Sequence, residues 1–323
     1  MKNIIFFVRH FTERGTEVAI YDYAKYNEEI LNNKSYIVCF KNVKERQSYS
    51  KFSSRFKILE IENITGITQL IEEYKIDFFY TLNAGGYEED YYQFDNNNIW
   101  GNCKTIKHCV FSTKSKEGDF YISISHFLNE KYDTNYPVIP HIVNLPESQE
   151  NLRNELNIPQ DAIVFGRYGG IDEFNIKFVY YAIKDLLDED ENVYFLFMNT
   201  KPFYIHPRII YLDSNINLSF KTTFINTCNA MIHARLMGET FGLSIAEFSS
   251  LNKPIITCRH GDIEHIKILG DRAIMYTSYE ELIRIFRNIR NIISIVDDWN
   301  CYKYYTPENI MKLFQEYIFN KET

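Results

Sequence analysis

The stretch from residues 228 to 257 constrains the fold more than any other part of the chain, because its apolar residues change their spacing along it. Cys228 to Ala234 is a short apolar segment that runs into a glycine-containing loop. Residues 241–251 then repeat apolar side chains at helical spacing, and a proline opens a second apolar segment, Ile255 to Thr257. The stretch therefore predicts a strand, a loop, a helix and another strand.

The same alternation extends through the rest of the chain. Predicted strands cover residues 3–8, 35–40, 56–59, 76–82, 105–112, 162–166, 193–198, 208–212 and 273–276. Helical patterns fall at 18–31, 44–51, 66–74, 176–187, 220–227, 279–291 and 307–319. Strands that alternate with helices are typical of parallel sheets, so the fold class is α/β.

The length indicates two domains. A chain of 323 residues that is 45% hydrophobic can bury two medium-sized cores. Val138 to Pro146 is an extended segment with prolines, and residues 147–157 turn polar. We therefore expect an N-terminal domain at 1–145 and a C-terminal domain at 146–323.

Charge and composition exclude several classes of partner. The chain has 35 basic and 43 acidic residues, a net charge of −8, so no overall basic field attracts nucleic acid or an anionic membrane. No apolar run reaches membrane-spanning length, and the first run is too short for a signal peptide. The six cysteines form no C-x-x-C motif. We expect a soluble, cytoplasmic protein without a transmembrane segment; the sequence does not specify its oligomeric state.

Two carboxylates and a helix start form the candidate site. Glu239 lies in the loop before the predicted helix, and Glu247 lies about two turns inside it. The amides around Phe241, Gly242 and Leu243 have no partners within the helix, and the glycine lets a phosphate approach the backbone. The alternative is an ordinary helix, with Glu247 solvated and Glu239 favoured by the helix dipole alone.

The order Gly238-Glu-Thr-Phe-Gly-Leu, then Glu247, then Asn252-Lys-Pro-Ile-Ile resembles the E-x7-E signature of the retaining family 4 glycosyltransferases of GT-B fold. The resemblance implies two Rossmann-like domains facing across a cleft, an acceptor-side first domain and a nucleotide-sugar-binding second one. It also implies that the last helix packs back on the first domain. The implied role in carbohydrate biosynthesis is sugar transfer from a nucleotide-diphosphate sugar to a glycan or other hydroxyl acceptor.

The resemblance also implies roles for single residues. Glu239 would contact hydroxyls of the donor sugar, and Glu247 the ribose. Arg167, at the end of a strand, would neutralise the departing diphosphate together with the helix amides. The family also has a lysine a few residues after this arginine; here the equivalent positions are 172–174, and Lys177 lies further on.

Three further candidates lie in the first half. Gly15 and Thr16 resemble the family's glycine-bearing first loop, near the donor diphosphate and the acceptor. His108 falls where relatives carry a donor-contacting histidine. The alternatives are a plain turn and a structural histidine. The glycine-rich loop at 83–90 would lie at a strand's carboxyl end, where ligands bind in open α/β sheets.

No cofactor or metal is expected, since the chain has no convincing D-x-D motif and the acidic run at 188–191 ends a helix as solvated surface. Two other functions remain open at this point. One is a GT-B sugar-nucleotide epimerase, which shares the fold. The other is a non-catalytic nucleotide-sugar-binding module, which the missing lysine would suit.

Overall fold

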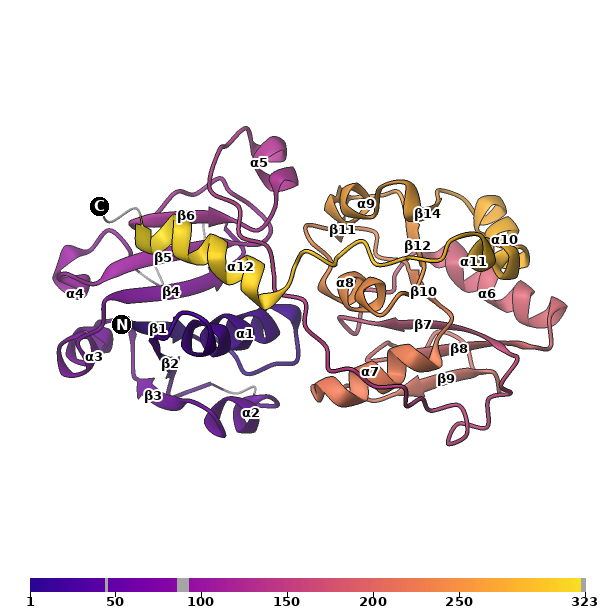
Figure 1. Ribbon diagram of the computed structural model, residues 1–323, viewed down its shortest axis with the longest axis horizontal. Helices are drawn as coiled ribbons and strands as arrows, with labels where there is room; N and C mark the ends of the chain where they lie inside the picture. The colour runs from indigo at the N-terminus through magenta and orange to yellow at the C-terminus, as the bar shows by residue number, and fades with distance from the viewer. Residues whose placement is uncertain (44–45, 86–92, 321–323) are drawn as a thin grey trace. The chain divides into compact units, whose positions relative to one another are not determined.

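The computed structural model describes residues 1–43, 46–85 and 93–320, so the end of the predicted loop at 83–90 and the start of the helical pattern at 44–51 lie outside the described residues. The chain divides into two compact units (Figure 1). Unit 1 comprises Met1–Ile142 and Tyr305–Thr323, and unit 2 comprises Val143–Tyr304. The last helix of the chain thus belongs to unit 1.

Unit 1 is built on a parallel sheet with strand order β3-β2-β1-β4-β5-β6. Its strands are β1 Asn3–Phe7, β2 Lys34–Phe40, β3 Lys57–Ile61, β4 Phe78–Asn83, β5 Lys104–Cys109 and β6 Phe120–Ser123. Its helices are α1 Gly15–Glu29, α2 Tyr49–Ser53, α3 Ile67–Tyr74, α4 Asn97–Trp100, α5 His126–Tyr132 and α12 Pro307–Phe314, with short turns at Ile64–Gly66 and Gln315–Phe319. The central strands are almost continuously apolar because helices cover both faces of a parallel sheet.

Unit 2 repeats the architecture with strand order β14-β12-β10-β7-β8-β9. Its strands are β7 Ile163–Tyr168, β8 Val193–Met198, β9 Ile209–Leu212, β10 Ala230–His233, β12 Ile255–Cys258 and β14 Ala273–Tyr276, with a small second sheet of β11 Gly238–Glu239 and β13 Asp262–Ile263. Its helices are α6 Lys177–Glu189, α7 Leu218–Thr227, α8 Leu243–Ser250, α9 Glu264–Leu269, α10 Tyr279–Arg287 and α11 Ile289–Ile295, with a turn at Gly270–Arg272.

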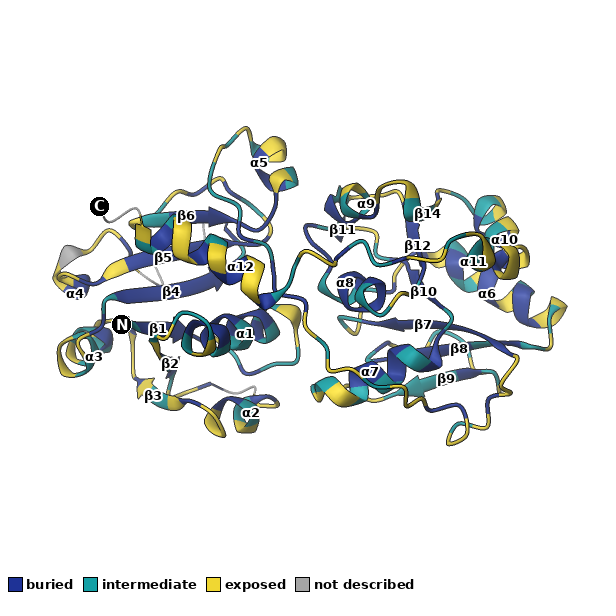
Figure 2. Ribbon diagram, in the orientation of Figure 1, coloured by how far each residue is buried: buried dark blue, intermediate teal, exposed yellow. Residues whose placement is uncertain are grey.

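Each unit has its own aromatic-rich core, seen as buried strands under half-exposed helices in Figure 2. In unit 1, Phe314 of α12 contacts the rings of Tyr23 on α1 and Tyr80 on β4. In unit 2, Phe165 and Phe195 on neighbouring strands pack against Phe286 of α10. The parallel pairing of the strands brings their carboxyl ends to one edge of each sheet, where open α/β sheets bind ligands.

Most predicted strands and helices are present, although helices α4 and α9 and strand β13 were not predicted. Strand β6 was not predicted, and the helical pattern at 279–291 is divided into α10 and α11 at Asn288. Residues 238–239, expected to be loop, pair with Asp262–Ile263. The acidic run at 188–191 lies at the exposed end of α6, where Glu189 pairs with Arg287, as expected for surface. No helix among the described residues is long and apolar enough to cross a membrane.

Candidate functional site

The loop that carries Glu239 is fixed by two close-packed glycines. Gly238 and Gly261 adopt positive φ angles of 65° and 69°. A Cβ atom on Gly238 would lie 2.1 Å from the carbonyl oxygen of Asp262, and one on Gly261 would lie 2.1 Å from the backbone of Met237. Only glycine lets the two segments cross this closely. The backbone that carries Glu239 therefore has little conformational freedom.

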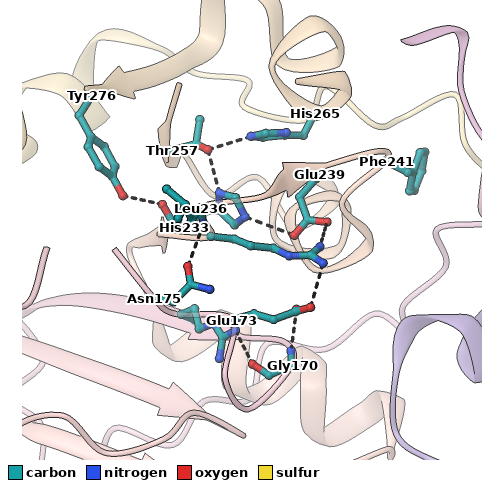
Figure 3. Close-up of polar contacts among 12 residues, drawn as sticks. Gly170, Glu173, Asn175, His233, Leu236, Glu239, Phe241, Thr257, His265 and Tyr276 are labelled. Carbon is teal, nitrogen blue, oxygen red and sulfur yellow. Dashed lines mark hydrogen bonds and ion pairs between the residues drawn. The ribbon is translucent and has the colours of Figure 1, made fainter. Parts of the chain in front are cut away.

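Two basic side chains hold the Glu239 carboxylate (Figure 3). Arg235 Nη1 donates to it over 2.7 Å, and His233 Nε2 lies 3.3 Å from its other oxygen. Burial would raise the pKa of Glu239, but the hydrogen bond from His233 and the charge of Arg235 outweigh burial and lower the pKa. Glu239 is therefore ionised at neutral pH, although only 15% of its side chain is exposed.

Arg235 also reaches the loop after β7. Its Nη2 lies 2.9 Å from Glu173, whose other oxygen accepts a hydrogen bond from the amide of Gly170. Glu173 occupies the region where the resembling family has its phosphate-binding lysine. In this chain that region carries a carboxylate, which pairs with Arg235 from the loop after β10.

Arg167 is the last residue but one of β7, and it contacts the same loop through the carbonyl oxygen of Gly170. It is 4% exposed, and its guanidinium donates to the carbonyl oxygens of Asn199 and Gly170 and to the hydroxyl of Thr200. Burial lowers its pKa to about 10, so it stays charged at neutral pH. A guanidinium has five N–H donors, and these contacts use three. Arg167 thus braces the loops after β7 and β8 and keeps donors for a further partner.

Helix α8 begins next to the Glu239 carboxylate and its two basic partners. Its N-cap, Gly242, has a φ of 82° and contributes no side-chain cap, so the amides of the first turn, beginning with the partly exposed Leu243, have no partner within the helix. Phe241 is 2% exposed, and its carbonyl accepts a hydrogen bond from Tyr302. Phe241 can therefore offer a ligand only its backbone.

Glu247 is buried in the middle of α8 rather than solvated. Lys221 Nζ on α7 lies 3.0 and 3.2 Å from its two oxygens, and the hydroxyl of Tyr168 also donates to it. Lys221 and Glu247 are 8% and 4% exposed. The alternative of an ordinary helix with a solvated glutamate is thus wrong. Sequence reasoning missed Lys221, although it precedes the buried Phe224 at helical spacing on α7.

The remaining candidates belong to unit 1. Gly15 starts α1 and is exposed, and the Thr16 hydroxyl donates to Glu17 over 2.8 Å. His108 has no exposed surface; its Nδ1 is 2.8 Å from the Tyr80 hydroxyl, and burial lowers its pKa to about 3. The ring is buried and neutral in unit 1, and its expected contact with the donor stays a prediction.

The structure thus brings together Glu239, Gly242, Leu243 and, through Glu173 and Arg235, Arg167, all in unit 2. The sequence places His233 and Arg235 at the end of a strand, from which both could reach the site, whereas Glu173 was not assigned to it. Among residues 1–43, 46–85 and 93–320, no group of three histidine, cysteine or acidic side chains could hold a metal ion.

No protein-family model and no curated protein matches the chain. Solved structures match it over its whole length, and they show that the chain has the GT-B fold, with two parallel-sheet α/β domains. HepE from Anabaena, in complex with UDP and glucose, has 12% identity and a TM-score of 0.73, covering 99% of this chain and 100% of HepE.

Two further structures widen the comparison. A glycosyltransferase from Rickettsia africae ESF-5 has 14% identity and a TM-score of 0.66, covering 99% of this chain and 95% of that one. A putative UDP-N-acetylglucosamine 2-epimerase from Listeria monocytogenes has 11% identity and a TM-score of 0.64, covering 100% and 98%. A glycosyltransferase and a putative epimerase thus share this architecture.

Proposed function

We propose that the protein is a retaining glycosyltransferase, which moves a sugar from a nucleotide-diphosphate sugar to a hydroxyl of a glycan or another acceptor. The observation that carries the proposal is the ionised Glu239, held by Arg235 and His233 beside the start of α8. A carboxylate there can accept hydrogen bonds from sugar hydroxyls. The free amides beside it can bind the phosphates to which the sugar is attached.

The reaction chiefly requires that the negative charge on the leaving diphosphate be stabilised. The first-turn amides of α8 and the unused donors of Arg167 supply hydrogen bonds for it, and a preorganised set of donors needs no reorganisation as charge develops. The resemblance implies that a phosphate oxygen of the donor accepts the acceptor's proton. A protein nucleophile is then unnecessary. Glu239 stabilises the sugar, through hydrogen bonds from its hydroxyls, as positive charge develops on the anomeric carbon.

Glu247 is proposed to bind the ribose of the donor nucleotide. Its carboxylate offers about four acceptor positions, and Lys221 and Tyr168 provide three contacts to it. A ribose hydroxyl can therefore be added without breaking the buried ion pair. The pair also fixes the direction in which the carboxylate points.

The direct test is donor binding followed by turnover. HepE is recorded with UDP and glucose, so UDP and UDP-glucose are the first probes, followed by GDP, dTDP and their sugars. A ligand at 100 times its Kd stabilises the native state by about 2.7 kcal/mol, which raises the melting temperature. Release of the nucleoside diphosphate only when acceptor hydroxyls are added, with the anomeric configuration kept in the product, would support the transferase.

We expect turnover without a divalent metal, because in this proposal Arg167 and the first-turn amides of α8 stabilise the diphosphate. Activity should be unchanged after treatment with EDTA and should not rise when magnesium or manganese is added. The control is the same assay on the untreated protein with the metal concentration measured. Loss of turnover in EDTA that manganese restores would contradict this prediction.

An epimerase is the second candidate, favoured by the likeness to the Listeria protein. UDP-N-acetylglucosamine incubated with the protein and no acceptor separates the two: an epimerase changes the sugar of the nucleotide, whereas a transferase does not. Tight binding without either conversion would instead indicate a non-catalytic module.

A further inference from the structure

We infer that Thr257 is a positioning residue for Glu239 and acts on it through the ring of His233. The inference rests on the proposed function, because it assumes that Glu239 contacts the donor sugar. Thr257 is 0% exposed, so it cannot itself touch a ligand. No feature of the sequence pointed to it.

The sheet register brings the residues together. His233 ends β10 and pairs directly with Thr257 of the parallel strand β12. The Thr257 hydroxyl lies 2.9 Å from His233 Nδ1 and 2.9 Å from Nε2 of His265, which projects from α9. Figure 3 shows Glu239, His233, Thr257 and His265 as a continuous row of side chains.

Counting protons shows that these contacts depend on one another. The hydroxyl of Thr257 has a single proton, so it can donate to only one of the two rings, and the other ring must present its own N–H. His233 Nε2 faces a carboxylate, which accepts only, so this nitrogen carries a proton. In a neutral His233 ring, Nδ1 is then the acceptor of the Thr257 proton.

His265 completes the chain from the other side. Burial lowers the pKa of His265 to about 3, with a smaller contribution from His233, so the ring is neutral. When Thr257 donates to His233, His265 Nε2 must donate to Thr257. His265 then donates to Thr257, Thr257 to His233, and His233 to Glu239. Glu239 also accepts a hydrogen bond from Arg235.

Other contacts hold the backbone of this region independently of the hydroxyl. The Tyr276 hydroxyl donates to the carbonyl oxygen of His233 over 2.8 Å, and His233 and Thr257 lie in adjacent strands of the sheet. Removing the Thr257 hydroxyl should therefore free the imidazole ring while the strand stays in place. Arg235 continues to pair with Glu239, and Glu173 continues to pair with Arg235.

The test compares Thr257→Val, which keeps shape but removes the hydroxyl, with Thr257→Ser, which keeps the hydroxyl. Thr227→Val is the matched control, because Thr227 is also 0% exposed in unit 2 and its hydroxyl bonds to Leu152 and Thr223 instead. We expect kcat to fall about tenfold in Thr257→Val, the effect of about 1.4 kcal/mol in the transition state. Affinity for UDP alone should stay within twofold, and Thr257→Ser and Thr227→Val should keep kcat within threefold.

A double-mutant cycle separates positioning from plain packing. If Thr257 acts through Glu239, adding Thr257→Val to Glu239→Gln should change kcat by less than twofold. An equal tenfold loss in both backgrounds, no loss in the single variant, or the same loss in Thr257→Ser would overturn the inference.

A spectrum of ¹⁵N-labelled histidine tests the same inference without turnover. At pH 8 we expect a single Nε2–H form of His233 in the native chain and a mixture of forms in Thr257→Val, with the signal assigned through His233→Asn. An unchanged spectrum would overturn the inference. If the native chain transfers no sugar while the spectrum behaves as expected, the proposed function fails and the hydrogen-bonded chain stands.

Discussion

At the scale of single residues, the two glutamates of the site have different surroundings, so replacing each should have a different effect on binding and turnover. Glu239 is held at the mouth of α8 by Arg235 and His233, whereas Glu247 lies inside the helix beside Lys221. Glu239→Gln should leave the affinity for bare nucleoside diphosphate almost intact and lower kcat, because its contact matters most as charge develops on the sugar.

Glu247→Gln should instead weaken binding of the bare nucleotide by about 1.5–3 kcal/mol, the value of a hydrogen bond to a charged group. Calorimetric titration of the nucleotide into both variants, beside steady-state kinetics with the sugar donor, checks both expectations. Equal losses of nucleotide affinity would show that the two assignments are wrong.

The buried ion pair of Lys221 and Glu247 allows a stability prediction. Lys221→Met leaves Glu247 charged and without its cation, and breaking a buried ion pair from one side typically destabilises by about 3–5 kcal/mol. The double variant Lys221→Met with Glu247→Gln removes both charges and should recover most of that loss. Melting temperatures of the three proteins test this, and a double variant as unstable as the single one would contradict it.

At the scale of elements, the crossing of two loops sets the position of Glu239. Gly261→Ala would add a Cβ 2.1 Å from the backbone of Met237, so the pairing of β11 with β13 must open. Gly270→Ala is a matched control, because Gly270 also has a positive φ, of 55°, but nothing lies within 4 Å of the added atom. The control should be destabilised only by the strain of its backbone conformation, φ 55° and ψ −132°, which costs about 1–3 kcal/mol for a residue with a side chain.

We therefore expect Gly261→Ala to lower both the melting temperature and the turnover, and Gly270→Ala to lower the melting temperature alone. A Gly261→Ala protein with native turnover would show that the loop crossing does not position Glu239. Both variants are compared with the native chain in the same buffer.

Most elements were predictable from the sequence because buried parallel strands and amphipathic helices leave different apolar spacings. The missed strand β6 is short and follows a polar loop, so its pattern is weak. The break at Asn288 is invisible for a different reason: apolar residues continue at helical spacing on both sides of it. The local spacing of apolar residues therefore predicts most helices and strands, and tertiary contacts decide where some of them end.

At the scale of the whole molecule, the sequence predicted the α/β class and the loop-to-helix unit of the site, because these depend on neighbouring residues. The partners that are distant in sequence, Lys221 and Glu173, were not predictable, because they meet Glu247 and Arg235 only in the folded unit. Lys221 and Glu247 are 26 residues apart, and Arg235 and Glu173 come from loops after different strands. A glutamate on a helix has the same local pattern whether it is solvated or buried.

Buried histidines in both units make the whole molecule sensitive to acid. Burial lowers the pKa of His108 and His141 in unit 1 and of His265 in unit 2 to about 3 in each case. In the unfolded chain a histidine has a pKa of about 6.5. Between these values the unfolded state binds protons that the folded state does not, so stability is full above pH 6.5 and falls as the pH drops towards 3.

Each buried histidine should remove about 1.4 kcal/mol per pH unit within that window. We expect urea unfolding measured at pH 8, 6, 5 and 4 to show a steady loss of stability below pH 6.5. His108→Gln should reduce the slope of the unfolding free energy against pH by the contribution of one proton, about 1.4 kcal/mol per pH unit. The exposed His126 provides the control variant, His126→Gln. Because His108 hydrogen-bonds Tyr80 within unit 1, its effect should follow the unfolding of that unit, observed through tryptophan fluorescence of Trp100. A slope in His108→Gln equal to that of the native chain would mean that this ring is charged in the folded protein.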